Sequence, residues 1–519
     1  MSFARRRTIS IIALSAMVTV GAAAADTRLA DAAQNGDTAA IRALLKLHAD
    51  PNAAQVDGMT ALGWAARNDD TQTAELLLAA GANAKVTNRY GVSPLTEAAT
   101  NGNGALVEML LKAGADANSA LPEGDTVLML ASKTGKPEAV KALLDHGAKV
   151  NAKEDWHGET ALMLAAGENH AAAVKLLLAH GADPNAAAMH LEFPEMKKGP
   201  GQVFSIYPAG GLTALMEAAR NNAYEAAQAL LDGKADPNKK NPQKLSAAMI
   251  ALMNGHWDLA KMLFEHGSDP NDGSLPLAAD VRNLVFLRPG QDRVETATPL
   301  DLIKDLLARG AKPDSTLPGP IPVLHNFGTN VKGPVDSPAL YRAAKAADLT
   351  VMRLLVDKGA DPKLKLKDEA TALHATVGIG LPQAMGDAAL AGPKPPEIIE
   401  TMQFLLDRGV DINGANATGM TVLHGAAQKG ADEIVQYLAD HGAKLDLKDK
   451  RGRTALDIAG ASAGKGQPAE ENMGGFRLEK HPTTVALLRK LMGLSAEEPA
   501  EKEEKPVETA KADEAGGAK

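Results

Sequence analysis

Leucines and glycines recur along this chain with a period of about 33 residues. Leucine-rich stretches end at Gly81, Gly114, Gly147 and Gly181, which are 33, 33 and 34 residues apart. A second pattern keeps the same phase, with a Thr or Ser, one apolar residue and then a Leu. Its first members are Thr60-Ala61-Leu62, Ser93-Pro94-Leu95, Thr126-Val127-Leu128 and Thr160-Ala161-Leu162. A fixed period of this length predicts a stack of similar units, in which each unit covers the apolar face of its neighbour.

Each unit is predicted to contain two helices. The Thr or Ser opens the first helix, because its hydroxyl can accept hydrogen bonds from free backbone N–H groups. A short turn follows, and then a second helix with a broader apolar stripe, such as Val140, Leu143 and Leu144. The periodic glycine ends that helix, because it adopts the left-handed conformation without steric cost. His48 and Lys234 stand where this glycine is expected, so we predict a positive φ at both.

The chain resembles the ankyrin-repeat family. The matching segments are Thr371-Ala372-Leu373-His374-Ala375-Thr376 and Thr421-Val422-Leu423-His424-Gly425-Ala426, which follow the Thr-Pro-Leu-His-x-Ala opening of that family. The resemblance covers roughly residues 27–493 and is carried by about twelve units in register. It implies an all-α repeat fold, an ankyrin solenoid of about 12 helix-turn-helix units with β-turn fingers, and a concave binding face built from finger tips and first helices.

The repeat phase also predicts the domain boundaries. We expect a signal peptide at 1–25, repeats 1–5 at 26–185, an insertion at 186–210, repeats 6–12 at 211–493 and a disordered charged tail at 494–519. Longer spacings between openings and stop glycines predict further insertions at about 284–297, 315–336, 377–397 and 462–481. One false opening, Thr298-Pro299-Leu300, lies too close to Gly310 for two helices.

The first residues favour export. Arg5-Arg6-Arg7 precede a short apolar run and then small residues up to Ala25, which is typical of a secretory signal peptide; a twin-arginine signal is the alternative. Its removal would change the net charge from −9 to −12, since it holds three arginines and no acidic residue. No basic stripe for nucleic acid is found, and no later segment is suited to membrane insertion. The chain has no cysteine, which excludes disulfides and thiol chemistry.

Motifs for catalysis or cofactor binding are weak. Gly460-Ala461-Ser462-Ala463-Gly464 matches a nucleophile elbow but follows a repeat helix instead of a strand. Nine of the thirteen histidines fall at repeat positions, and the other four, including His157, show no ligand spacing. Runs such as Asp183-Pro184-Asn185 are better explained by turn chemistry than by calcium binding. We therefore predict no catalytic, cofactor or metal residues and a protein that is not an enzyme.

The candidate residues are partner-binding ones. The ankyrin resemblance implies contacts from Tyr90, Trp156 and Arg451 at finger tips and from Trp64 on a first helix, although Trp64 can instead pack against a neighbouring helix. The insertions add four aromatic candidates, whose rings can either bind a partner or fold back onto the stack. These are Phe204, Tyr207, Phe286 and Phe327.

These observations lead to one expected function and two alternatives. We expect an exported, periplasmic or secreted, monomeric scaffold that binds an unidentified protein partner through its concave face and insertion edge. The first alternative is an enzyme whose site is built from the insertions of the C-terminal half. The second is a secreted factor that acts on host proteins.

Overall fold

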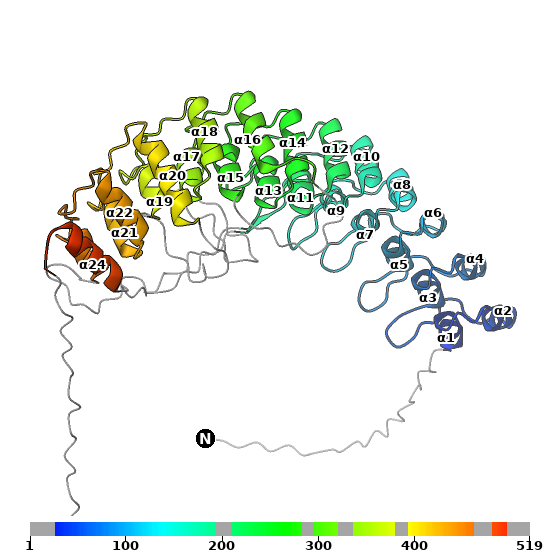
Figure 1. The fold of residues 1–519 in the computed structure, drawn as a ribbon. Helices are drawn as coiled ribbons and strands as arrows, with labels where there is room; N and C mark the ends of the chain where they lie inside the picture. Colours follow the sequence, from blue (N-terminus) through cyan, green and yellow to red (C-terminus); the bar gives the residue numbers. More distant parts are fainter. Residues whose placement is uncertain are drawn as a thin grey trace, which may run out of the picture. The chain divides into compact units, whose positions relative to one another are not determined.

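A computed structural model describes residues 26–191, 209–282, 295–319, 336–378, 393–460 and 480–495. In these ranges it contains helices α1 to α24, which follow one another along the chain as twelve successive pairs (Figure 1). The predicted all-α solenoid of about twelve units is therefore confirmed. The predicted signal peptide and nearly all of the predicted tail lie outside the described residues, as do the central parts of the insertions.

The chain divides into two compact units, which are described separately. Unit 1 comprises Met1–Met189 and Glu225–Lys234, and unit 2 comprises His190–Tyr224 and Ala235–Lys519. The helices of unit 1 are α1 (Arg28–Gln34), α2 (Thr38–Lys46), α3 (Ala61–Arg67), α4 (Thr71–Ala79), α5 (Pro94–Asn101), α6 (Gly104–Lys112), α7 (Val127–Thr134), α8 (Pro137–Asp145), α9 (Ala161–Gly167), α10 (Ala171–Ala179) and most of α12 (Tyr224–Asp232).

Unit 2 contains the remaining helices. They are α11 (Ala214–Asn221), α13 (Ala247–Met253), α14 (Trp257–Glu265), α15 (Ser274–Val281), α16 (Pro299–Ala308), α17 (Ala339–Lys345), α18 (Leu349–Asp357), α19 (Ala372–Thr376), α20 (Pro395–Leu406), α21 (Val422–Gln428), α22 (Asp432–Asp440), α23 (Ala455–Ala459) and α24 (Pro482–Leu491). Strands β1 (His190–Leu191) and β2 (Ala209–Gly210) pair antiparallel and lie within the predicted insertion at 186–210, near its two ends.

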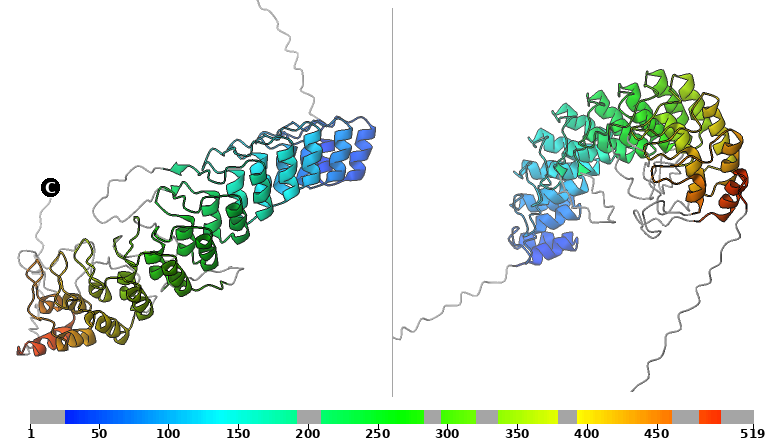
Figure 2. Two further views of the ribbon diagram at one scale, coloured as in Figure 1. Left: turned by 90° about the horizontal axis from the view of Figure 1, so that it is seen from above. Right: turned by 90° about the vertical axis from the view of Figure 1, so that its left-hand side faces the viewer.

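Within unit 1 the helices form two layers. The first helices α1, α3, α5, α7 and α9 contact one another in order, and the second helices α2, α4, α6, α8 and α10 do the same (Figures 1 and 2). The first helices are rich in small side chains, and Ala61, Ala65 and Ala66 of α3 are buried completely or almost so. Small residues let neighbouring helices approach closely, so each repeat covers its neighbour's apolar face.

Hydroxyl side chains cap the first helices as predicted. The Thr60 hydroxyl accepts the backbone N–H of Gly63 at 3.2 Å, and Ser93, Thr160 and Thr213 cap their helices in the same way. Thr298 caps α16, which is the second helix of its pair. Thr298 is therefore not the opening of a new unit, as its spacing from Gly310 predicted.

The helix-stop positions have the predicted left-handed backbone. Gly81 has a φ of 90°, and the two replacements, His48 and Lys234, have φ values of 57° and 66°. A side chain in this conformation costs up to about 1–2 kcal/mol relative to glycine.

An asparagine ladder links successive repeats. In unit 1 the side-chain amide of Asn118 donates to the Gly147 carbonyl at 3.2 Å, and its oxygen accepts the Lys149 N–H at 2.8 Å. Asn52 and Asn151 make the equivalent pair of bonds in unit 1; in unit 2 Asn238, Asn271 and Asn413 do so. The preceding Asp makes a local turn, since Asp183 accepts the Asn185 N–H at 2.8 Å. The predicted turn chemistry is confirmed, and the ladder is a second role that the prediction missed.

One predicted insertion has a well-defined exit. The Asp258 carboxylate, at the start of α14, accepts the backbone N–H groups of Thr296 and Ala297 and the Thr296 hydroxyl at 2.8–2.9 Å. The neighbouring Glu295 carboxylate accepts the Asp258 N–H at 2.6 Å. These bonds fix the chain against the preceding repeat just before α16 begins.

Among the helices of the described ranges, none combines the length and apolarity needed to span a bilayer.

Candidate functional site

Four loops of unit 1 form a row, which we call the finger row: residues 55–59, 88–92, 121–125 and 154–159. Each loop closes on itself through a backbone hydrogen bond, such as Asn88 N–H to the Val92 carbonyl at 2.9 Å. Neighbouring fingers are also bonded, since Arg89 donates to the Asp57 carbonyl at 2.9 Å and Asp155 to the Glu123 carbonyl at 3.1 Å. The fingers lie on the side of the first helices (Figure 1).

The bond between the second and third fingers is missing, because Pro122 occupies the donor position. Proline has no backbone N–H, so it cannot repeat the bonds made by Arg89 and Asp155. Its ring packs on Gly91 instead, where Pro122 Cδ lies 3.0 Å from the place a Cβ would occupy. Gly91 also has a φ of +77°, so both the backbone and the close contact require glycine there.

Two predicted contact residues extend into solvent from the finger row. Trp156 is 69% exposed and Tyr90 is 57% exposed, which is unusual for such large side chains. The Arg89 guanidinium lies 4.9 Å from the centre of the Tyr90 ring. The Trp156 and His157 rings lie 5.9 Å apart at an angle of 41°. Both aromatic residues are therefore available to a partner.

Trp64 is held more tightly than these two. It is half-buried on α3, and its indole N–H donates to the Gln55 side chain at 2.7 Å. Gln55 in turn donates to the side chains of Asp31 and Gln34 at 2.7 and 2.8 Å. This network ties Trp64 to its own finger and to α1, so the alternative of a structural role has direct support.

Glu154 builds the fourth finger of the row. It is 7% exposed, and its carboxylate accepts the backbone N–H groups of Trp156, His157 and Glu159 at 2.6, 2.7 and 2.9 Å. Burial acts to raise the pKa of Glu154, but the three N–H donors outweigh it and hold the pKa below its ordinary value. The carboxylate is therefore charged at neutral pH and fixes the backbone of the loop that carries Trp156.

This finger is one residue longer than the other three. Its closing bond joins Glu154 to Glu159, whereas the earlier loops close between residues four apart. The extra residue accounts for the single spacing of 34 between Gly147 and Gly181. The longer loop suits the longer Glu154 side chain, while the shorter loop at 88–92 uses the Asn88 side chain for the same purpose.

Beside this finger lies a hollow of about 350 Å³, which we call the Trp156 hollow. It lies over the first helices α7 and α9, between the third and fourth fingers of the row. Its lining residues are Glu123, Asp125, Met129, Leu130, Lys133, Glu154, Trp156, His157, Glu159 and Leu164. The surface is therefore aromatic and aliphatic in part, with an excess of carboxylates.

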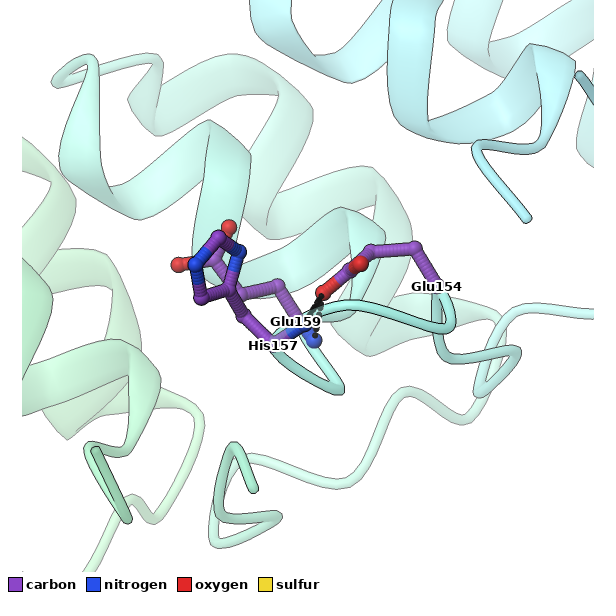
Figure 3. Close-up of side chains that lie close together, drawn as sticks. All are labelled: Glu154, His157 and Glu159. Carbon is purple, nitrogen blue, oxygen red and sulfur yellow. Dashed lines mark hydrogen bonds between the residues drawn. The ribbon is translucent and has the colours of Figure 1, made fainter. Parts of the chain in front are cut away.

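The side chains of Glu154, His157 and Glu159 come together in this finger (Figure 3). One ligand-type atom of each lies within 4.8 Å of the others. The sequence shows no ligand spacing for His157, and this group was not predicted, because it is the lengthened finger that brings residues three and five positions apart together. The Glu154 carboxylate points to the backbone N–H groups of the loop, and its oxygens already accept hydrogen bonds from them (Figure 3). These three side chains therefore form a structural turn more readily than a metal site.

The other predicted contact residues lie elsewhere. Arg451 is exposed at a finger tip of unit 2, and its backbone N–H donates to Asp449 at 2.9 Å. Burial acts to raise the pKa of Asp449, but hydrogen bonds from Arg453 hold it below its usual range, so Asp449 parallels Glu154. The four insertion aromatics, Phe204, Tyr207, Phe286 and Phe327, lie outside the described residues.

Stacked helix pairs, each with a projecting finger, define a helical repeat solenoid. A family model described as ankyrin repeats (3 copies) matches residues 29–120, 95–188, 199–277 and 394–467, which together make up more than half of the chain. The chain belongs to the ankyrin-repeat family.

Two curated proteins are similar to part of this chain. A transient receptor potential cation channel subfamily A member 1 homolog of Caenorhabditis elegans is 32% identical over 129 residues, which are 25% of this chain and 9% of the relative. The E3 ubiquitin-protein ligase hecd-1 of the same organism is 43% identical over 61 residues, 12% of this chain and 2% of the relative. The chain thus spans less than a tenth of the length of these curated relatives.

A solved structure, the human ASB11 ankyrin repeat domain, is 24% identical with a TM-score of 0.38. The match covers 46% of this chain and 97% of that domain.

Proposed function

We propose that this chain is an exported, non-enzymatic scaffold that binds a protein partner through the finger row of unit 1, with the insertion edge as a further contact. Ankyrin repeats are generally protein–protein interaction domains and typically lack enzymatic activity. A rigid stack offers a long contoured surface, and its affinity depends on a few anchor side chains.

The exposure of Tyr90 on the second finger and of Trp156 on the fourth finger of the row carries this proposal. Tryptophan and tyrosine are enriched among the residues that dominate binding energies. The backbone of both is fixed by acceptors in their own loops, Glu154 for Trp156 and Asn88 for Tyr90. Anchors that are already ordered lose less conformational entropy when they bind.

The proposal of export rests on the first 25 residues, whose basic start, short apolar run and small-residue end are typical of a secretory signal peptide. Cleavage after Ala25 would leave Asp26 as the first residue, next to Arg28, to which Asp26 is paired at 2.7 Å. The intact mass of protein recovered from the periplasm or the medium tests cleavage. Recovery of the uncleaved chain in the cytoplasm alone would refute export.

Capture of the partner from the host's periplasmic extract tests the binding surface. We expect the double variant Trp156→Ala, Tyr90→Ala to lower the affinity for the captured protein by about 30-fold or more, equivalent to about 2 kcal/mol for a central anchor. Leu47→Ala is a matched control, because Leu47 is 77% exposed on unit 1 but lies at the end of α2, in the layer of second helices. Equal retention by the wild type and the double variant would show that the finger row is not the binding surface.

A further inference from the structure

The Trp156 hollow combines an aromatic wall, an aliphatic floor and a rim of carboxylates. Trp156 projects beside it, and Leu130 of α7 and Leu164 of α9 are half-buried within it. Its volume of about 350 Å³ is large enough for one long side chain and too small for a folded element. A ligand group that fits must therefore offer an extended apolar stem and a polar end.

The charge of the hollow determines what that polar end should be. Glu123, Asp125 and Glu159 line it, and within the described residues none of the three takes part in a salt bridge of 4 Å or less. Glu154 adds a fourth carboxylate, whereas Lys133 is the one lysine or arginine among the lining residues. The hollow is therefore net negative, and a cation placed in it would relieve repulsion between its carboxylates.

The pKa of Asp125 shows the effect of the neighbouring carboxylates. Burial raises its pKa, and the nearby Glu154 and Glu123 carboxylates raise it further, while Lys133 acts in the opposite direction. A cation bound in the hollow would favour the charged form of Asp125.

We propose that the Trp156 hollow binds an arginine side chain of the partner protein. The guanidinium plane stacks on the Trp156 ring and donates hydrogen bonds to Asp125 and Glu159, while the methylene stem lies on Leu130 and Leu164. Arginine suits this site better than lysine, because its planar group stacks on aromatic rings and pairs with carboxylates through two hydrogen bonds. The proposal rests on the proposed function, since it names the chemistry of the partner at that surface.

A divalent cation held by Glu154, His157 and Glu159 is the competing occupant. The three backbone N–H donors already directed at Glu154 reduce its capacity to coordinate a metal ion. The aromatic wall and aliphatic floor of the hollow would also have no role in such a site. The observations therefore favour the arginine side chain, and metal binding becomes one outcome of the test.

Fluorine NMR provides a direct test, because the chain contains only three tryptophans. The exported form would be labelled with 5-fluorotryptophan, and the Trp156 signal assigned with Trp156→Phe. We expect N-acetyl-argininamide to shift the Trp156 signal saturably, with half-saturation on the order of millimolar, as expected for a single side chain. The signals of Trp64 and Trp257 should stay unchanged and report intact folding.

Variants and matched probes decide the chemistry. Asp125→Asn with Glu159→Gln should raise the half-saturation concentration about fivefold or more, whereas Glu75→Gln, which removes an exposed carboxylate of α4, should leave it unchanged. N-acetyl-norleucinamide, which keeps the stem and lacks the charge, should cause no comparable shift.

An equal shift with the norleucine probe would overturn the proposal in favour of an apolar site. A Trp156 shift with zinc or calcium chloride but none with the arginine probe would overturn it in favour of a metal site.

The two proposals fail in different ways. If the arginine probe does not bind but capture of the partner still depends on Trp156, the arginine site is wrong and the finger-row interface stands. If the probe binds while the captured protein is retained by the Trp156 variant, the hollow recognises arginine but is not the interface.

Discussion

At the scale of single residues, the first position of several fingers determines the shape of the loop. Asn88 and Glu154 in unit 1, and Asn416 and Asp449 in unit 2, all accept backbone N–H groups from the residues that follow them. Side chains with an acceptor oxygen can replace a backbone partner in a tight turn. The exposed tip residues are thereby held in place without needing a hydrophobic contact of their own.

Buried histidines at helix starts should make unit 2 sensitive to acid. His424 accepts the Thr421 N–H through Nδ1 at 3.1 Å, and its Nε2 lies 3.2 Å from the Arg453 carbonyl, so the neutral ring fits with its proton on Nε2. Burial lowers the pKa of His424. The stabilisation is therefore present above the ordinary pKa of about 6.5 and is lost as the pH falls towards the folded-state value, with a slope of at most about 1.4 kcal/mol per pH unit for this group.

Urea unfolding at pH 7.5 and pH 5 measures this effect. We expect the loss of unfolding free energy between the two pH values to be smaller in His424→Gln than in the wild type, although the variant is less stable at pH 7.5. His441→Gln, at an exposed helix end in the same repeat, is a suitable control. The same pH dependence in wild type and His424→Gln would show that His424 does not contribute.

At the scale of elements, the extra residue of the finger at 154–159 changes what the repeat presents. The regular fingers close between residues four apart, whereas this one closes between residues five apart and carries two adjacent aromatic rings, Trp156 and His157, at its tip. The widened loop is stable because one carboxylate accepts three N–H groups. A single insertion in a regular pattern thus produces the most exposed tryptophan and the hollow beside it.

Glu154→Ala should loosen this finger without unfolding the repeat. Loss of an acceptor for three N–H groups costs about 1–3 kcal/mol locally, so amide exchange of Trp156, His157 and Glu159 should become about 5- to 150-fold faster. Glu154→Gln keeps an acceptor oxygen and should give a smaller change. Glu75→Ala on α4 should leave these amides unaffected, and unchanged exchange in Glu154→Ala would contradict the assigned role.

The elements were largely predictable from the sequence, and the site only in part. Helix pairs, hydroxyl caps and left-handed stops follow from spacing, because each depends on residues close in the chain. Trp156 was predicted as an exposed tip because the repeat phase places it there. The hollow was not predicted, since it needs side chains from α7, α9 and two fingers. The 34-residue spacing was visible, but its consequence for Glu154, His157 and Glu159 depends on how the loop closes.

At the scale of the whole molecule, the asparagine ladder recurs in both units and couples neighbouring repeats wherever an asparagine holds the ladder position. Every member has the same two bonds, a side-chain donor to the stop-glycine carbonyl and an oxygen that accepts an N–H of the following turn. In a repeat protein, stability is approximately the sum of the stabilities of the repeats and of the contacts between neighbours. The ladder therefore contributes to cooperativity as well as to stability.

Asn151→Ala should weaken the junction between the fourth and fifth repeats. It removes a 3.0 Å bond to the Gly181 carbonyl and a 2.8 Å bond from the Asp183 N–H, which together should cost about 1–2 kcal/mol. We also expect a broader urea transition. The control is Asn83→Ala, because the Asn83 side chain accepts only the Lys85 N–H within its own turn. Equal destabilisation by the two substitutions would show that the bonds between repeats add nothing.

The proline at position 122 affects how binding of a partner would change the rigidity of the chain. Within the finger row, only the junction between the fingers at 88–92 and 121–125 lacks a backbone hydrogen bond. Tyr90 and Trp156 lie in fingers on opposite sides of this junction. A partner that contacts both aromatic residues at once would span this junction. Binding would then stiffen the solenoid where its own backbone does not, and slower amide exchange at Gly91 and Gly124 would be its signature.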